Sequence, residues 1–351
     1  MTRSKPNSAL LGGTRLAVLA LAASLTLAAG AAQDQVVNLY SARHYDTDEA
    51  LYTNFTKATG IEINRIEAGD DALLERIRNE GTNSPADVLL IVDAARLARV
   101  EELGLFAPVR SKLLEQRIAP EFRDPNGMWF GFSSRARVIV YDKATVNPQD
   151  VASYESLADP KNKGKVCTRP GSHPYMLALV SAMIEHHGEQ KAEEWARGVV
   201  ANFARPPRGG DTDQIKAVAA GECGVALTNS YYLVRLMRSA KPEERAVAAR
   251  VGLVWPDQKG YGTHMNISGA GLMRNAPNRE NAVRFLEYLA SDSAQAYFAT
   301  GNNEWPVVKT AAAKNPELAS LGTFKADPLS AAQLGKNLAA AQRIVDRAGW
   351  K

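Results

Sequence analysis

Residues 86–92 read Ala-Asp-Val-Leu-Leu-Ile-Val, an almost entirely apolar run. Short apolar runs of this kind are typical of strands that are buried on both faces, as in parallel sheets. The chain continues with Asp93, a suitable N-cap for a helix, and Gly104, a suitable helix end. Two similar strand–helix pairs precede this one, with strands expected at 35–40 and 61–66. This alternation predicts a doubly wound α/β domain with helices on both faces of a parallel sheet.

The chain has 351 residues, which is too long for one ordinary core, so two domains are expected. Residues 128–141 resemble one long strand, but Gly131 and the pair Ser133-Ser134 interrupt it. We expect this segment to leave the first domain and enter the second, and residues 263–273 to cross back. The predicted boundaries are 33–133 plus 264–305 for the first lobe, and 134–263 plus 306–351, with C-terminal packing helices, for the second.

Residues 1–32 have the pattern of a cleaved secretory signal peptide. Three basic residues, Arg3, Lys5 and Arg15, precede or open an apolar run over 16–29, and small residues follow it. The run is shorter than the ~18 residues of a spanning helix, which disfavours an uncleaved membrane anchor. Removing these three basic residues lowers the net charge from +4 to +1. No basic block long enough to bind nucleic acid occurs, so a nucleic-acid partner is not expected.

The only two cysteines are Cys167 and Cys223. In an exported protein such a pair can oxidise, so the sequence leaves two alternatives, a single disulfide or two buried free thiols. The two do not form a zinc pattern, because no histidine partners lie near them.

Four of the eleven tyrosines fall in loops or first helical turns directly after expected strands: Tyr45, Tyr175, Tyr231 and Tyr232. In open α/β sheets this is the edge at which ligands bind. Packing is the ordinary role of any single tyrosine, and the hypothesis depends on four at equivalent positions. His44 stands beside Tyr45 and has the same two interpretations, a surface histidine or a metal ligand.

Phenolate oxygens are ligands suited to a hard, highly charged cation. A free phenol has a pKa of about 10 and is neutral at pH 7, but a trivalent cation can displace its proton. Three or four phenolates then roughly balance a 3+ charge. Because binding releases protons, the affinity should fall as the pH falls.

Three stretches resemble the periplasmic ferric-ion-binding proteins of bacterial iron ABC transporters, and are most similar to the iron-deficiency-induced, cyanobacterial-type branch. They are Ser-Ala-Arg-His-Tyr at 41–45 with Asp48, Asn-Ser-Pro-Ala-Asp-Val at 83–88, and Asn-Ser-Tyr-Tyr at 229–232. The resemblance implies an α/β, two-lobed periplasmic-binding-protein type II fold, a transferrin-like Venus flytrap in which each lobe is a mostly parallel sheet flanked by helices. It also implies periplasmic Fe(3+) as bound cargo, and an inner-membrane permease with its ATPase as partners of a monomeric, unanchored protein.

The same resemblance implies a set of five iron ligands, namely His44, Tyr45, Tyr175, Tyr231 and Tyr232. With five protein ligands, no additional anion is needed. Trp305 stands where relatives often carry tyrosine and is expected to pack. Lobe closure would bend the chain near 131–135 and 266–269.

Two other functions compete with ferric-ion binding. The same fold could bind an oxyanion or a small organic solute through helix N-termini and arginines. Four arginines are noted, Arg43, Arg135, Arg205 and Arg208: one of them near the cleft could offset excess phenolate charge or orient a phenolate, although each taken singly is expected on the solvated surface. A secreted enzyme is disfavoured, because the chain has no HExxH, no GxSxG and no usefully spaced carboxylate pair.

Overall fold

The computed structural model describes residues 1–2, 35–43, 48–308, 310–311 and 314–351. The chain divides into a segment over 1–35 and one compact unit over 36–351, and the elements below belong to the compact unit. Almost all of the expected signal peptide, and both His44 and Tyr45, lie outside the described residues. No helix in the described part has the length and apolar content that a membrane crossing requires.

The first sheet is built around three parallel strands, β1 (Val36–Ser41), β2 (Glu62–Glu67) and β3 (Val88–Val92), as predicted. Strand β9 (Met265–Met273) pairs with β3 in the antiparallel sense, and β5 (Phe130–Asp142) pairs with β9, also antiparallel. Two short strands complete the sheet, β4 (Phe106–Ala107) on β9 and β10 (Trp305–Pro306) on β5.

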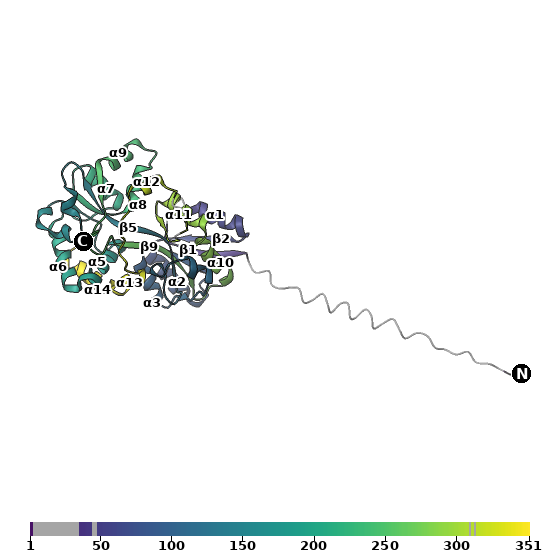
Figure 1. Cartoon of the computed structure of the whole chain (residues 1–351). Coiled ribbons are helices and arrows are strands. Elements are labelled where there is room, and N and C mark those ends of the chain that lie inside the picture. Colours follow the sequence, from purple (N-terminus) through teal and green to yellow (C-terminus); the bar gives the residue numbers. More distant parts are fainter. Residues whose placement is uncertain (3–34, 44–47, 309, 312–313) are drawn as a thin grey trace. The chain divides into compact units, whose positions relative to one another are not determined.

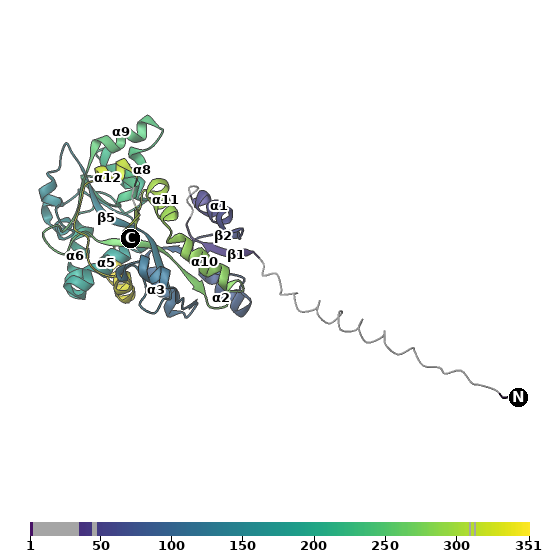
Figure 2. The same ribbon diagram turned by 45° about the vertical axis from the view of Figure 1, so that its right-hand side comes forward.

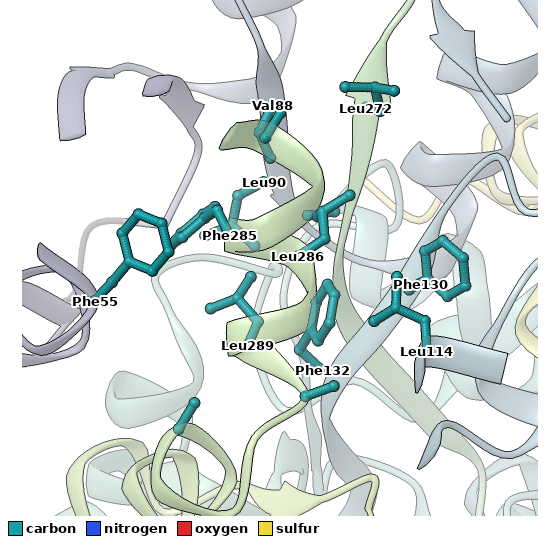
Figure 3. Close-up of a cluster of buried hydrophobic side chains, with 14 of the residues drawn as sticks. Phe55, Val88, Leu90, Leu114, Phe130, Phe132, Leu272, Phe285, Leu286 and Leu289 are labelled. Carbon is teal, nitrogen blue, oxygen red and sulfur yellow. The ribbon is translucent and has the colours of Figure 1, made fainter. Parts of the chain in front are cut away.

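Helices cover both faces of this sheet, as Figure 2 shows. One face is covered by α1 (Asp48–Thr59), α10 (Arg279–Leu289) and α11 (Asp292–Asn302), and the other by α2 (Asp70–Glu80) and α3 (Ala94–Glu102). The expected N-cap is present, because the side chain of Asp93 accepts a hydrogen bond from the backbone N–H of Ala95. Figure 3 shows Phe285, Leu286 and Leu289 of α10 packed on the sheet beside Phe132, and all four side chains are fully buried.

The second sheet contains the far half of β5, together with β6 (Val166–Cys167), β7 (Val225–Asn229) and β8 (Val251–Val254). Only β6 and β7 are parallel, whereas β7 and β8 both pair with β5 in the antiparallel sense. The expectation of a mostly parallel sheet in each lobe is therefore wrong: this half is mixed, and in the first sheet the pairings made by β9 and β5 are antiparallel as well. The reason is that the crossing strand β5 supplies the centre of the sheet and runs against its neighbours.

Strand β5 has 13 residues and takes part in both sheets, as the interrupted pattern at 128–141 predicts. Figure 1 shows β5 and β9 running between the helices α5–α9 on one side and β1, β2 and α10 on the other. The pairing of β5 with β9 shifts in register between Gly131 and Ser133. A Cβ at Gly131 would lie 2.8 Å from the carbonyl oxygen of Phe122, so the close packing at this point requires glycine.

The remaining helices surround the second sheet or join the two halves. They are α5 (Pro174–His187), α6 (Glu189–Ala201), α7 (Asp211–Ala219), α8 (Ser230–Met237) and α9 (Pro242–Arg250), with α4 (Lys112–Arg117) and α12 (Pro316–Ser320) in connections. Short 3-10 turns occur at Gly81–Asn83, Pro120–Phe122, Pro148–Val151, Glu155–Ala158 and Pro160–Asn162. The C-terminal end of the chain forms two helices, α13 (Ala331–Lys336) and α14 (Leu338–Ala348), interrupted at Asn337.

The two cysteines form a disulfide, which decides between the alternatives that the sequence leaves open. Cys167 lies in β6, and Cys223 lies just before β7. Both residues are buried. The bond therefore links the last residue of β6 to the segment that enters β7, at the end of β7 opposite to the loop that follows it.

Candidate functional site

Three of the predicted tyrosines lie together and form what we call the tyrosine site, Tyr175, Tyr231 and Tyr232. The phenol oxygens of Tyr175 and Tyr231 are 3.3 Å apart. The rings of Tyr231 and Tyr232 are stacked, with centroids 4.2 Å apart. Residues 56 positions apart in the chain thus present their hydroxyl groups at one place.

Local sequence explains how these tyrosines reach the same edge. Tyr231 and Tyr232 lie in the first turn of α8, which begins directly after β7. Ser230 holds this turn against β5, because its Oγ accepts a hydrogen bond from the backbone N–H of Ala136 (3.3 Å). Tyr175 lies in the first turn of α5, where Pro174 occupies the first position of the helix.

His173 stands directly against Tyr175 without belonging to the predicted ligand set. It caps α5 by accepting a hydrogen bond at Nδ1 from the backbone N–H of Tyr175 (3.2 Å), and the two rings meet edge to face at 4.5 Å. Burial, together with the nearby positive charge of Arg169, lowers the pKa of His173 to about 3. The imidazole is therefore neutral at physiological pH and adds no positive charge beside the phenols.

Arginines surround the tyrosine site. The guanidinium carbons of Arg135, Arg137 and Arg169 lie 5.5, 5.9 and 5.2 Å from the ring centroid of Tyr175. Arg169 also donates from Nη2 to the phenol oxygen of Tyr232 at 3.2 Å. Burial raises the pKa of Tyr232, with further contributions from Tyr175 and Asp211 that outweigh the opposing effect of Arg169. Tyr232 is consequently a neutral phenol at pH 7 in the metal-free protein.

Arg135 is buried, and not at the surface as expected for an arginine taken singly. Its Nη1 donates to Ser268 Oγ at 3.0 Å, while Nε and Nη2 have no hydrogen-bond partner among the described residues. Burial lowers its pKa, but the charges of Tyr175, Glu304, Asp93 and Tyr231 act in the opposite direction and raise it overall. The group therefore stays positive next to phenols that are expected to ionise.

Arg43 is also buried, and it belongs to a cluster formed with Asp48, Ser133 and Glu304. Its Nε lies 2.8 Å from Asp48, and its Nη1 lies 3.3 Å from Glu304. Ser133 on β5 donates to the same carboxylate of Glu304 at 2.6 Å. Arg43 and Asp48 flank residues 44–47, so the two ends of the stretch that carries His44 and Tyr45 are fixed in the protein interior. The ligand role of these two residues stays a prediction.

The other two candidate arginines lie elsewhere. Arg205 and Arg208 both pair with Glu222, at 2.9 and 2.8 Å. Trp305 packs as expected, in a cluster with Trp255 and Phe324. Among the described residues, no group of three or more His, Cys, Asp or Glu side chains could hold a metal ion.

Arg137, Arg169 and Asp211 were not identified from the sequence. Asp211 is fully buried and forms ion pairs with Arg137 (2.6 Å) and Arg169 (2.5 Å). Burial raises the pKa of Asp211, but the two guanidinium groups lower it by more, so the carboxylate stays ionised. Arg169 lies two residues after β6, and so at the same sheet edge as the tyrosines that follow β7.

Residues 83–326 match the family described as bacterial extracellular solute-binding protein. The chain belongs to this family. Within the solute-binding family, it is 51% identical to iron uptake protein A1 of Synechocystis, over 91% of this chain and 88% of that protein. It is 30% identical to the Fe(3+)-binding periplasmic protein of Serratia marcescens, over 90% of this chain and 93% of that protein.

Solved structures of solute-binding proteins match the fold closely. The iron- and citrate-bound IdiA (FutA) of Trichodesmium superimposes with a TM-score of 0.86 at 52% identity, covering 90% of this chain and all (100%) of that one. The ferric binding protein of Campylobacter jejuni gives a TM-score of 0.87 at 35% identity, with the same coverage of 90% and 100%. These matches confirm the expected two-lobed, transferrin-like type II fold. The lobe boundaries in this chain stay a prediction.

Proposed function

We propose that this protein binds Fe(III) through the tyrosine site together with His44 and Tyr45. The observation that carries the proposal is the convergence of Tyr175, Tyr231 and Tyr232 beside buried arginines. The relatives named for iron uptake or Fe(3+) binding support the same cargo. Three or four phenolates around one ferric ion leave little net charge, and the nearby guanidinium groups offset what remains.

The protein acts as the solute-binding component of an ABC transporter. It is exported to the periplasm, where the segment over 1–32 is removed, captures the ion and delivers it to an inner-membrane permease driven by an ATPase. The family description and the periplasmic relative support this role. The function is binding and delivery, because five protein ligands leave little room for the open coordination position that a catalytic metal needs.

The visible spectrum tests this function directly. Adding Fe(III) citrate to metal-free protein should give a red-orange phenolate charge-transfer band. The double variant Tyr231→Phe, Tyr232→Phe should lose it. Tyr288→Phe is the matched control, since it removes a phenol that packs against Phe55 in the first half of the molecule. A wild-type protein that stays colourless would overturn the ferric proposal and would favour an oxyanion or organic solute.

A further inference from the structure

Asp211 is a fully buried carboxylate, and its three hydrogen-bond partners come from three separate segments. Its Oδ2 accepts from Arg137 Nη1 on β5 at 2.6 Å, and also from the backbone N–H of Asn229 at the end of β7 at 2.7 Å. Its Oδ1 accepts from Arg169 Nε, beyond β6, at 2.5 Å. One side chain at the start of α7 therefore holds the ends of two strands to the crossing strand.

Each of these partners stands next to a tyrosine of the site. Asn229 comes two residues before Tyr231 in the chain. Arg169 uses the far side of its guanidinium group to donate from Nη2 to the oxygen of Tyr232 at 3.2 Å. Arg169 thus has its Nε directed to Asp211, its Nη1 to His173 Nε2 at 3.0 Å and its Nη2 to a phenol, and these contacts together fix its orientation.

The charges in this network suit a phenolate. Arg137 and Arg169 share a single carboxylate, so the buried group carries one net positive charge. Arg169 is only 13% exposed and cannot be fully solvated. A charged guanidinium group is attracted to an ionised oxygen by the Coulomb interaction of opposite charges, which a neutral oxygen does not offer. The interaction at Tyr232 should therefore strengthen when the phenol loses its proton to bound metal.

We propose that Asp211 and Arg169 are positioning residues for the cargo: Asp211 orients Arg169 so that its Nη2 donates a hydrogen bond to the metal-bound oxygen of Tyr232. This inference rests on the proposed ferric function. Hydrogen-bonding partners of metal ligands orient the ligand and tune the metal, and their loss typically costs about 10–100-fold in affinity. The network acts through Tyr232, and neither positioning residue contacts the ion.

The hydrogen bond has a spectroscopic consequence that a purely structural ion pair lacks. Donation to a phenolate withdraws electron density from its oxygen and raises the energy of charge transfer from oxygen to iron. Losing the donor should therefore move the charge-transfer band to longer wavelength. A residue that only supports the fold would change stability and leave the position of the band unaltered.

The test uses Arg169→Gln and Asp211→Asn in the full mature chain, each titrated with Fe(III) against citrate as competitor. We expect both variants to bind about 10–100-fold more weakly and to show a band at longer wavelength. Arg169→Lys keeps the charge but not the paired geometry, and should recover only part of the affinity. Asp213→Asn is the matched control, because Asp213 is exposed and hydrogen-bonds to the backbone N–H of Gly210.

Several outcomes decide the matter. If Asp211→Asn does not fold, Arg169→Gln still gives the answer, since it leaves the pair between Asp211 and Arg137 in place. Wild-type affinity and an unshifted band in Arg169→Gln would overturn the inference. So would weaker binding with an unmoved band, which would mean a structural role alone. A colourless wild-type protein is a different result, because it removes the ferric function itself.

Discussion

The phenol oxygens of Tyr175 and Tyr231 lie 3.3 Å apart, although one residue lies in the first turn of α5 and the other in the first turn of α8. In an octahedral site with metal–oxygen distances of about 2.0 Å, adjacent ligand oxygens are roughly 2.8 Å apart. The two tyrosines are therefore near the spacing that a shared ion requires. A small shift of the first turn of α5 or α8 would bring the two phenol oxygens to that spacing.

Replacing Tyr175 with Phe should weaken Fe(III) binding by at least about 100-fold, more than the loss of a partner that only orients a ligand. The charge-transfer band should also lose intensity, because one phenolate no longer contributes. Competition with citrate measures the affinity, and the absorbance at saturation measures the band. Equal affinity in this variant and in the Tyr288→Phe control would exclude Tyr175 from the ligand set.

Iron affinity should fall as the pH falls. The pKa of Tyr232 is raised, mainly by burial, so this phenol carries its proton at neutral pH in the metal-free protein. Binding must release that proton, and protons therefore compete with the ion. The affinity should change about tenfold per pH unit for each proton released. Titrations from pH 8 down to pH 6 measure the slope, and an affinity that is constant over this range would contradict phenolate ligation.

Arg135 is expected to support binding at a cost to the fold. Two of its buried nitrogens have no hydrogen-bond partner among the described residues, which is unfavourable in the metal-free protein. Arg135→Met should therefore keep or raise the thermal stability of the metal-free protein while lowering iron affinity by about tenfold or more. Calorimetry and iron titration measure the two effects separately. A variant that loses thermal stability and keeps full iron affinity would instead mean that Arg135 supports the fold and not iron binding.

The disulfide between Cys167 and Cys223 should stabilise the second half of the molecule. Its cysteines are 56 residues apart, and chain-entropy arguments give about 4 kcal/mol for a loop of that size. The double variant Cys167→Ser, Cys223→Ser should lower the unfolding free energy by an amount of that order in denaturant titrations. Reducing the wild-type protein should bring its unfolding midpoint to that of the double variant. If the wild-type protein and the double variant had the same unfolding midpoint under oxidising conditions, the disulfide would not stabilise the protein as expected.

The sequence predicted those parts of the fold that local patterns encode. Strands such as β3 are apolar runs with a helix cap after them, and the crossing segment is marked by its length and by Gly131. The mixed pairing of the second sheet could not be predicted, because the sequence of an apolar strand does not show whether its neighbours are parallel or antiparallel to it. Only the position of β5 between β7, β8 and β9 decides it.

The candidate site was predictable where residue type and strand ends coincide, as for Tyr231 and Tyr232. The charged residues behind them were not. From the sequence alone, an arginine such as Arg135 or Arg43 is expected to be solvent-exposed. Only the long-range packing of the fold shows that these two are buried. Asp211 lies 42 residues from Arg169 along the chain, and no local pattern relates them. His44 and Tyr45 remain predictions from the sequence.

Strand β5 carries Ser133 and Arg135 at the point where it passes from one sheet to the other. Ser133 holds Glu304, and Arg135 holds Ser268 on β9. A membrane partner that bends β5 there would pull on both contacts at once and so disturb the electrostatic balance around the phenols.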